Sequence, residues 1–571
     1  MMKRTISFAA ALAFWSVAAF LVAAEPLRLN FQFAGVSEDQ GAIVEKIVKQ
    51  RVSERVASGE LNLSYAIDLS FEPEEYSLET SGTDATLRAG SFPGLIFASG
   101  KLLRSLEYGA DSFTVPELTI REKPDASFRC CYFARHFHNW YHMASNEELE
   151  RYVEDLALWG FNAIATISVP VVNLNLDPAS EDWRQAVDGV KTIRAASKRL
   201  GLSFTGLDCI NQACLDMPEE LKGTPNVDPK RGNNGINACP SKPGGTEYLD
   251  RLTRAIFASF DGAQTDFTCW WPFDEGGCEC EQCGPWATNG FLKCAARYCK
   301  MVNDEFAPDQ KFILSTWTYH EDEFEAVWEW VKDHPEVPYI LADAHADFPK
   351  YPLEHALPEG HKLITFPEIS MQGRFPWGGF GATPQPRRFT ELWEQVRGHV
   401  DGCMLYSEGP FEDINKIIES GFYFRNESAE DSLREYARYE LAGADPEDFV
   451  ALCRDLEAIL VLKDRNPEYT AAALDAMKLA VKIDLEIVPK LRDCWRWRQF
   501  YCRCLLEYER NVRGNENTQT CVDAILELQR LYHSDLFPEG CVDPLHYCTQ
   551  PVLPQGDIGV FKRPEEEIQE R

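Results

Sequence analysis

Positive charge is scarce in this chain of 571 residues. Lysine and arginine together number 57, whereas aspartate and glutamate number 90, so the formal net charge is −33. Binding to nucleic acid or to an anionic membrane surface depends on basic patches, so this balance argues against both kinds of partner. An anionic substrate would need a local basic pocket.

Long apolar runs are missing after the first 24 residues. The basic pair Lys3-Arg4 precedes an apolar stretch from Ile6 to Ala24, which ends in small residues and is typical of a cleavable signal peptide. An uncleaved membrane anchor is the alternative, because about 20 apolar residues can span a bilayer. We therefore predict a protein that is exported to the periplasm or the cell exterior, without a membrane span once residues 1–24 are removed.

A Gly-rich phosphate-binding loop is also missing, which argues against an open doubly wound sheet. Short apolar runs alternate with helical patterns between residues 122 and 430. The predicted strands are Phe128–His136, Phe161–Ile167, Leu202–Cys209, Asp266–Phe273, Lys311–Thr318, Tyr339–Asp343, Lys362–Pro367 and Gly402–Ser407. Eight strand–helix units of this length predict an α/β protein with a (β/α)8 TIM barrel.

The segments on either side of the barrel have patterns of their own. Residues 25–121 alternate between strand and helix periodicities, which predicts a small N-terminal α/β domain. Residues 431–535 are helical with little strand signal and predict a C-terminal helical domain. Residues 536–571 are Pro-rich and are predicted to form a tail.

Nineteen cysteines suit an oxidising compartment, and the odd count leaves at least one thiol free or paired with another chain. Cys278, Cys280 and Cys283 form a C-x-C-x2-C motif whose thiolates could hold zinc. Because a second C-x2-C is missing, disulfides that brace this loop are favoured, and neither a metal nor another cofactor is predicted. Further disulfides are predicted among Cys494, Cys502, Cys504 and Cys521.

Active sites of such barrels lie at the carboxyl ends of the strands. The residues predicted there are rich in carboxylates, which bind hydroxyl groups, and in aromatic rings, which suit the apolar faces of sugars. A glycan is therefore the predicted substrate. The candidate substrate-binding residues are Arg135, His136, Trp271, Trp317, Tyr319, Glu368, Tyr406 and Glu408.

Two adjacent carboxylates, Asp274 and Glu275, follow the fourth predicted strand. Adjacent side chains point in different directions, so a division of roles is expected, with Glu275 as proton donor and Asp274 as an orienting group. Burial against neighbouring tryptophans such as Trp271 would raise the pKa of Glu275 towards the value that a general acid needs. The alternative is a pair of carboxylates that caps a helix.

These residues resemble the pattern of family 20 glycoside hydrolases, the β-N-acetylhexosaminidases. In that family an arginine ends the first strand and an Asp-Glu pair ends the fourth, and Arg135 and Asp274-Glu275 stand at these positions here. The small domain before the barrel resembles that of families 20, 67 and 84, and the helical domain after it resembles that of families 67, 84 and 163. The resemblance implies a substrate-assisted mechanism in which Asp274 orients the 2-acetamido group of the sugar and Glu275 acts as general acid and base.

Three alternatives remain open at this stage. An α-glucuronidase-type uronidase would use Glu275 together with Glu408 or Glu368, and it is favoured if basic residues such as Arg135 converge on the substrate carboxylate. A non-catalytic glycan-binding barrel is a second alternative. A zinc protein built on the cysteine motif is a third.

Overall fold

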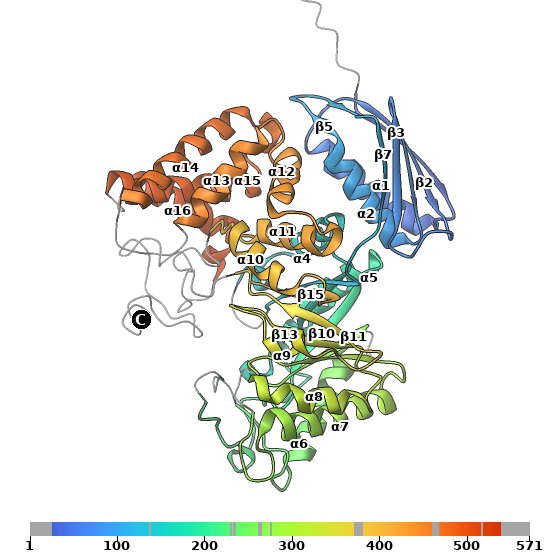
Figure 1. Cartoon of the computed structure of the whole chain (residues 1–571), viewed down its shortest axis with the longest axis vertical. Helices are drawn as coiled ribbons and strands as arrows, with labels where there is room; N and C mark the ends of the chain where they lie inside the picture. Colours follow the sequence, from blue (N-terminus) through green and yellow to red (C-terminus); the bar gives the residue numbers. More distant parts are fainter. Residues whose placement is uncertain are drawn as a thin grey trace, which may run out of the picture.

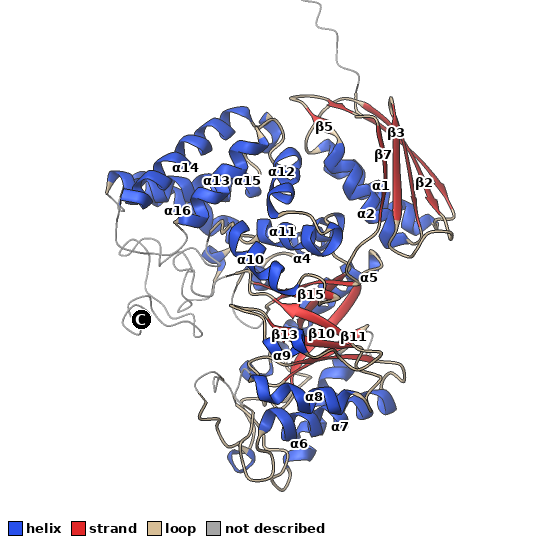
Figure 2. Cartoon of the chain, in the orientation of Figure 1, coloured by secondary structure: helices blue, strands red, loops and turns tan. Residues whose placement is uncertain are grey.

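The computed structural model has three parts: an N-terminal sheet, a closed barrel and a C-terminal group of helices (Figures 1 and 2). The residues that it describes are 26–135, 139–228, 231, 236–260, 265–273, 277–370, 381–459, 467–514 and 518–537. The predicted signal peptide and nearly all of the predicted tail lie outside these residues. The domain boundaries stay predictions.

The N-terminal part is a five-stranded sheet in the order β1-β2-β4-β3-β7. Its strands are β1 (Arg28–Ala34), β2 (Glu60–Ile67), β4 (Asp84–Ala89), β3 (Tyr76–Ser81) and β7 (Leu118–Glu122), and a short hairpin joins β5 (Glu107–Tyr108) to β6 (Phe113–Thr114). Helices α1 (Glu38–Ser53) and α2 (Phe92–Ser105) pack on the sheet. Ser37 and Gln40 form a capping box that starts α1.

Eight parallel strands close into the barrel in the order of the chain, which confirms the predicted fold. They are β8 (Phe128–Phe133), β9 (Ala163–Ile167), β10 (Ser203–Cys209), β11 (Phe267–Trp271), β12 (Lys311–Ser315), β13 (Tyr339–Asp343), β14 (Lys362–Phe366) and β15 (Gly402–Ser407). Each lies within a strand predicted from the sequence. The ring closes where β8 pairs with both β9 and β15.

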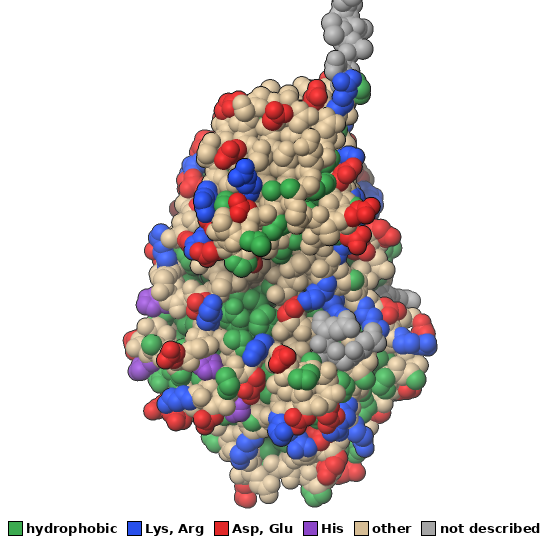
Figure 3. Space-filling model, turned by 90° about the vertical axis from the view of Figure 1, so that its right-hand side faces the viewer, with side chains coloured by type: hydrophobic (Ala, Val, Ile, Leu, Met, Phe, Trp, Pro, Cys, Tyr) green, Lys and Arg blue, Asp and Glu red, His purple; other side chains and the backbone are tan. Residues whose placement is uncertain are grey.

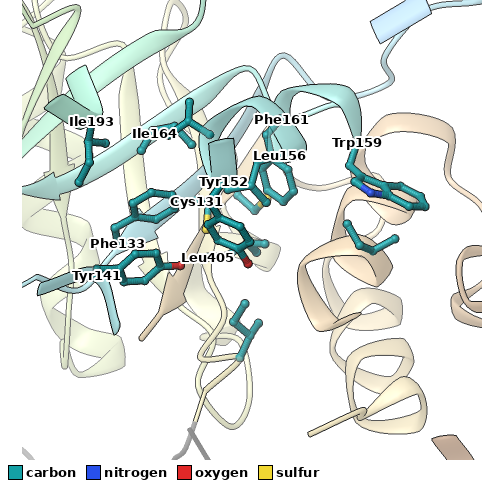
Figure 4. Packing of buried hydrophobic residues seen from close by; sticks show 14 of the residues in the cluster. Cys131, Phe133, Tyr141, Tyr152, Leu156, Trp159, Phe161, Ile164, Ile193 and Leu405 are labelled. Carbon is teal, nitrogen blue, oxygen red and sulfur yellow. The ribbon is translucent and has the colours of Figure 1, made fainter. Parts of the chain in front are cut away.

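Alternate residues of each strand face the barrel interior and the surrounding helices. In β8, Cys130 and Tyr132 pack inside the barrel, whereas Cys131 and Phe133 pack against the helical layer. Figure 4 shows this outer side, where Cys131 and Phe133 lie beside residues of α4 (Asn146–Leu158). The rings of Phe133 and Tyr141 stack with their centroids 4.1 Å apart.

Helices surround the barrel and continue beyond it. Those of the barrel, besides α4, are α3 (Trp140–Met143), α5 (Glu181–Arg199), α6 (Gly245–Ser259), α7 (Phe291–Glu305), α8 (Phe324–Val331), α9 (Lys350–Glu354), α10 (Pro386–Val396) and α11 (Asp413–Arg425). The C-terminal group comprises α12 (Ala429–Glu440), α13 (Pro446–Ala458), α14 (Pro467–Glu486), α15 (Trp495–Tyr508) and α16 (Gln519–Tyr532).

A buried network of charges joins the three parts. Arg496 of α15 donates to Asp155 of α4 at 3.0 Å and to Asp413 of α11 at 2.9 Å. Arg51 of α1 donates to the other oxygen of Asp155 at 2.9 Å. All four side chains are more than nine-tenths buried, so the N-terminal sheet, the barrel and the C-terminal helices are held as one unit.

Charges of both signs are interspersed on the face in Figure 3, with hydrophobic side chains gathered near its middle. Many surface charges are paired, as Arg254 is with Glu305 at 2.7 Å. Within the described ranges, no helix has the length and apolar character needed to cross a membrane. No disulfide joins the cysteines of these ranges, so the predicted disulfides of the C-x-C-x2-C loop and of the helical domain are not observed.

Candidate functional site

An aromatic group lies where the barrel strands end. Trp271 ends β11, Trp317 follows β12 and Phe366 ends β14. The ring centroid of Trp271 lies 5.6 Å from that of Trp317 and 4.9 Å from that of Phe366. The structure therefore brings together the two tryptophans that the sequence predicted as substrate-binding residues. Trp317 is only partly buried, whereas Trp271 is buried.

Two further rings extend this group. His345, after β13, lies 4.4 Å from Trp317 between ring centroids, and its Nδ1 is 2.8 Å from Asp343 Oδ1. Tyr406 of β15 lies 6.0 Å from Phe366. The aromatic group, which consists of Trp271, Trp317, His345, Phe366 and Tyr406, thus spans the ends of β11 to β15.

Glu408 lies at the edge of the aromatic group. Its Oε1 accepts a 2.8 Å hydrogen bond from the hydroxyl of Tyr406. Burial raises the pKa of Glu408 well above its usual range and outweighs the opposing effect of that hydrogen bond, and the charges of Glu368 and Glu412 add to the rise. The carboxyl is therefore biased towards its protonated form, as a proton donor requires.

Glu368 follows β14, and its backbone forms a single parallel β-bridge with the backbone of Tyr406. Its carboxylate accepts a 2.6 Å hydrogen bond from the backbone N–H of Ser370. Arg388 donates to its backbone carbonyl at 2.7 Å, which holds the strand end in place. The predicted residues Glu368, Tyr406 and Glu408 are thus brought together at neighbouring strand ends.

Glu412 is a carboxylate that the sequence analysis missed. It is fully buried and accepts hydrogen bonds from the backbone N–H groups of Glu408 at 2.6 Å and Gly409 at 2.9 Å. The hydroxyl of Ser407 donates to it at 2.8 Å. Glu412 therefore fixes the turn that carries Glu408. The only sequence signal was the acidic pair Glu412-Asp413 at the start of the last barrel helix, α11.

Arg135 does not turn towards the aromatic group, contrary to the role implied by the family resemblance. Its Nε donates to the carbonyl of Tyr141 at 3.0 Å, and its Nη1 reaches the carbonyl of Ala186 at 3.3 Å. The guanidinium lies so close to α5 that a side chain at Gly189 would collide with it. Burial lowers the pKa of Arg135 to about 10.

Tyr319 is also placed differently from the prediction. Its hydroxyl donates to the carbonyl of Ala287 at 2.6 Å, and its ring packs against Phe273 and Phe324. Tyr319 is almost fully buried, so its side chain packs against the loop after β11 and is not exposed to a ligand.

Asp208, a further carboxylate near a strand end, faces away from the barrel interior. Its neighbour Leu207 points into the barrel, so Asp208 points outwards, towards α6. Its carboxylate accepts a 2.9 Å hydrogen bond from Ser168, which follows β9. Burial raises the pKa of Asp208 to about 7. It lines a small cavity between β10 and α6 together with Gln212 and Leu249.

The predicted residues Asp274, Glu275 and His136 lie outside the described residues. The strand β11 ends at Trp271, and the described chain resumes at Gly277. In sequence, therefore, the Asp274-Glu275 pair follows the fourth barrel strand, and its role stays a prediction.

One group among the described residues has the composition and spacing of a metal site. It consists of Cys239, Cys278, Cys280 and Cys283, whose sulfur atoms all lie within 4.8 Å of one another. It lies in the loops that follow β10 and β11 and shares no residue with the aromatic group.

Comparison with known proteins identifies the fold. No protein-family model matches the chain, and no curated protein matches it. A family 89 glycoside hydrolase from Clostridium perfringens superposes with a TM-score of 0.58 at 12% identity, over 91% of this chain and 68% of that chain. The structure of CpGH84B gives 0.50 at 10% identity, over 88% and 92% of the two chains.

A family 20 exo-β-N-acetylglucosaminidase from Vibrio harveyi gives a TM-score of 0.49 at 13% identity, over 77% of this chain and 75% of that chain. At such identities the likeness concerns the fold alone. The chain therefore shares its barrel fold with these glycoside hydrolase structures of families 84 and 89, in agreement with the fold implied by the resemblance.

Proposed function

We propose that this protein is a glycoside hydrolase that cleaves an N-acetylhexosaminide or a related glycan at the carboxyl end of the barrel. The observation that carries the proposal is the aromatic group beside the two buried carboxyl groups of Glu368 and Glu408. Flat rings suit the apolar faces of sugars, and glycosidases work with carboxyl groups around the scissile bond. The family 89 enzyme of the same fold has been solved in complex with its substrate, GlcNAc-α-1,4-galactose.

Glu275 and Asp274 take the central roles in this proposal. The 2-acetamido oxygen of the sugar attacks the anomeric carbon while the glycosidic bond breaks, and Glu275 gives its proton to the leaving oxygen. Water then attacks the anomeric carbon and gives a proton to Glu275, while the bond between that carbon and the acetamido oxygen breaks, which regenerates the acetamido group. Asp274 orients and polarises that group. The position of the pair directly after β11 supports these roles, since active-site residues of barrels stand there.

A mechanism with two enzyme carboxylates is the second candidate, and the proximity of Glu368 and Glu408 favours it. Glu275 would again be the acid. Glu408 or Glu368 would be the nucleophile or base. A nucleophile must be ionised, whereas burial favours the protonated form of Glu408. A uronidase is less well supported, because Arg135 binds backbone carbonyls beside α5.

We further propose that the protein is exported and that cleavage follows Ala24. The basic start and the apolar stretch from Ile6 support this proposal. N-terminal sequencing of the mature protein is expected to begin at Glu25. A mature protein that still carries Lys3-Arg4 would contradict it.

The test of the enzymatic proposal is a substrate screen of the wild type and Glu275→Gln. The panel comprises aryl glycosides of GlcNAc, GalNAc and glucuronic acid, together with mixed glycans. Glu281→Gln is the matched control, because Glu281 is an exposed carboxylate in the same loop. We expect release of one N-acetylhexosamine by the wild type and the control and its loss in Glu275→Gln. Glycan binding without cleavage across the panel would favour a non-catalytic barrel instead.

A further inference from the structure

Four cysteines converge from two segments that are distant in sequence. Cys239 lies shortly before α6, whereas Cys278, Cys280 and Cys283 follow β11. The sulfur of Cys239 lies 3.7 Å from that of Cys280 and 3.9 Å from that of Cys283. All four sulfur atoms lie within 4.8 Å of one another.

These separations fit a shared metal ion better than a covalent link. A disulfide would place two sulfur atoms about 2.05 Å apart. A tetrahedral zinc ion with Zn–S bonds of about 2.3 Å would place its four sulfur ligands roughly 3.8 Å apart. The separations of Cys239 Sγ from Cys280 Sγ and from Cys283 Sγ, 3.7 Å and 3.9 Å, bracket the tetrahedral value.

The backbone around the four cysteines also suits thiolate ligands. The N–H groups of Cys283 and Gly284 donate to the carbonyl of Cys280 at 3.0 Å and 2.8 Å, which forms a tight turn between two of the cysteines. The N–H of Thr224 donates to the sulfur of Cys278 at 3.3 Å. The hydroxyl of Ser241 lies 3.0 Å from the sulfur of Cys283. Such donors offset part of the negative charge that four thiolates bring.

Burial supplies a second reason for a cation. Cys239, Cys278 and Cys283 are buried, and Cys280 is half-buried. Thiolates at this depth are costly unless a positive charge compensates them, and a metal ion does so directly. Four sulfur ligands in a tetrahedron select zinc or iron, and zinc is the common choice for a site that is structural.

We propose that Cys239, Cys278, Cys280 and Cys283 bind one zinc ion, which ties the loop after β11 to the segment before α6. Four protein ligands leave no position for substrate or water, so the ion is structural. Glu275 precedes Cys278 by three residues, so the ion would anchor the loop that leads from Glu275. The site does not depend on the proposed glycosidase activity, since none of its ligands belongs to the aromatic group.

This inference replaces the disulfides predicted for the loop. The C-x-C-x2-C motif lacked a second C-x2-C because the fourth ligand is the single Cys239, which stands in another loop. Sequence spacing alone does not reveal such a ligand, whereas the barrel brings the two loops together at neighbouring strands.

The test is the metal content of the full-length protein, purified under reducing conditions without chelators. We expect one zinc per chain in the wild type and almost none in the double variant Cys280→Ser/Cys283→Ser. Cys494→Ser is the matched control: Cys494 is half-buried, lies in the helical part and caps the start of α15, where serine is favoured. Its zinc content should equal that of the wild type. Protein loaded with cobalt should show the absorption of a tetrahedral thiolate complex.

A measurement on the wild type covers the case in which the double variant does not fold. Titration of its thiols with an organic mercurial, followed with a zinc-sensitive dye, should release one zinc per chain. Three results would overturn the proposal. They are an absence of zinc in reduced wild-type protein incubated with zinc chloride, an unchanged zinc content in the double variant, and a disulfide among the four cysteines in peptides of the unreduced protein.

Discussion

The hydroxyl of Tyr406 donates a 2.8 Å hydrogen bond to Oε1 of Glu408, two residues further along the end of β15. Tyr406 belongs to the aromatic group, so this bond holds the Glu408 carboxyl beside it. Burial raises the pKa of both residues well above their usual ranges. A protonated carboxyl is thus held next to the rings that the proposal assigns to sugar binding.

Glu408 should make the folded protein less stable as pH rises. Its pKa is higher in the folded state than in the unfolded chain, so between the two values only the folded state keeps the proton. The contribution of Glu408 to the free energy of unfolding is complete below the pKa of the unfolded chain, about 4.3. It falls by up to about 1.4 kcal/mol per pH unit as pH rises from there towards the pKa in the folded state. Glu408→Gln should remove this slope in urea unfolding measured from pH 4 to pH 8.

The exposed Glu281→Gln provides the control for that series, since it should keep the slope of the wild type. If Glu408→Gln and the wild type lose stability in parallel over the whole range, folding does not raise the pKa of Glu408, and the protonated carboxyl inferred for it is wrong.

Arg135→Gln should affect stability more than catalysis. The substitution removes the hydrogen bonds to the carbonyls of Tyr141 and Ala186 and leaves both acceptors without their charged donor. A loss of about 1–3 kcal/mol in the free energy of unfolding follows from such unpaired buried groups. Thermal unfolding and steady-state kinetics at a temperature where both proteins are folded provide the measurement. An unchanged unfolding temperature with a loss of kcat/KM above a hundredfold would instead support the sugar-binding role of the family resemblance.

Trp317→Ala should weaken substrate binding more than it slows the chemistry. Trp317 is the partly exposed tryptophan of the aromatic group, whereas Trp271 is buried at 4% exposure. Removing its ring should raise KM about tenfold, a loss of ~1.4 kcal/mol, with kcat changed less. Trp330→Ala, a partly buried tryptophan on α8 that stacks on His334, is the matched control and should leave KM unchanged. A drop in kcat at constant KM would place Trp317 among residues that act only in the transition state.

Asp155→Asn should destabilise the whole chain. Burial alone would raise the pKa of Asp155, but the charges of Arg51 and Arg496 lower it overall. Removing this carboxylate leaves two buried arginines short of a partner, which costs about 3–5 kcal/mol. Because a lowered pKa stabilises the fold above the unfolded value of about 3.9, the gap between wild type and variant should shrink as pH falls below it. Urea unfolding at pH 7 and pH 3.5 measures both effects, with Lys300→Ala in the exposed pair to Asp304 as a control.

Each barrel strand could be predicted because the pattern that marks a strand lies within a few consecutive residues. Each strand is a short apolar run between turn residues, and Trp271, Tyr406 and Glu408 were found simply because they stand where such runs end. The direction in which a side chain points, by contrast, depends on partners that the sequence pattern does not show. Arg135 and Tyr319 stand at the expected positions, yet backbone carbonyls of Tyr141 and Ala287 draw them away from the aromatic group.

Contacts between residues that are distant in sequence could not be predicted either. Cys239 joins the C-x-C-x2-C motif only because β10 and β11 are neighbours in the barrel. Glu412 reads in sequence as part of a helix start, and its role appears only when Ser407, Glu408 and Gly409 are seen to donate to it. Such residues require the three-dimensional arrangement, since no spacing rule links them.

The most direct test of the account is the leaving-group dependence of Glu275→Gln. A general acid matters most when the leaving oxygen is strongly basic. With an alkyl N-acetylhexosaminide, kcat/KM should fall about 10²–10⁴-fold relative to the wild type. With the 2,4-dinitrophenyl glycoside, whose leaving oxygen departs without a proton, the loss in the first step should almost disappear. An equal loss for both substrates, or full activity of the variant on the alkyl glycoside, would contradict the assignment of Glu275 as the acid.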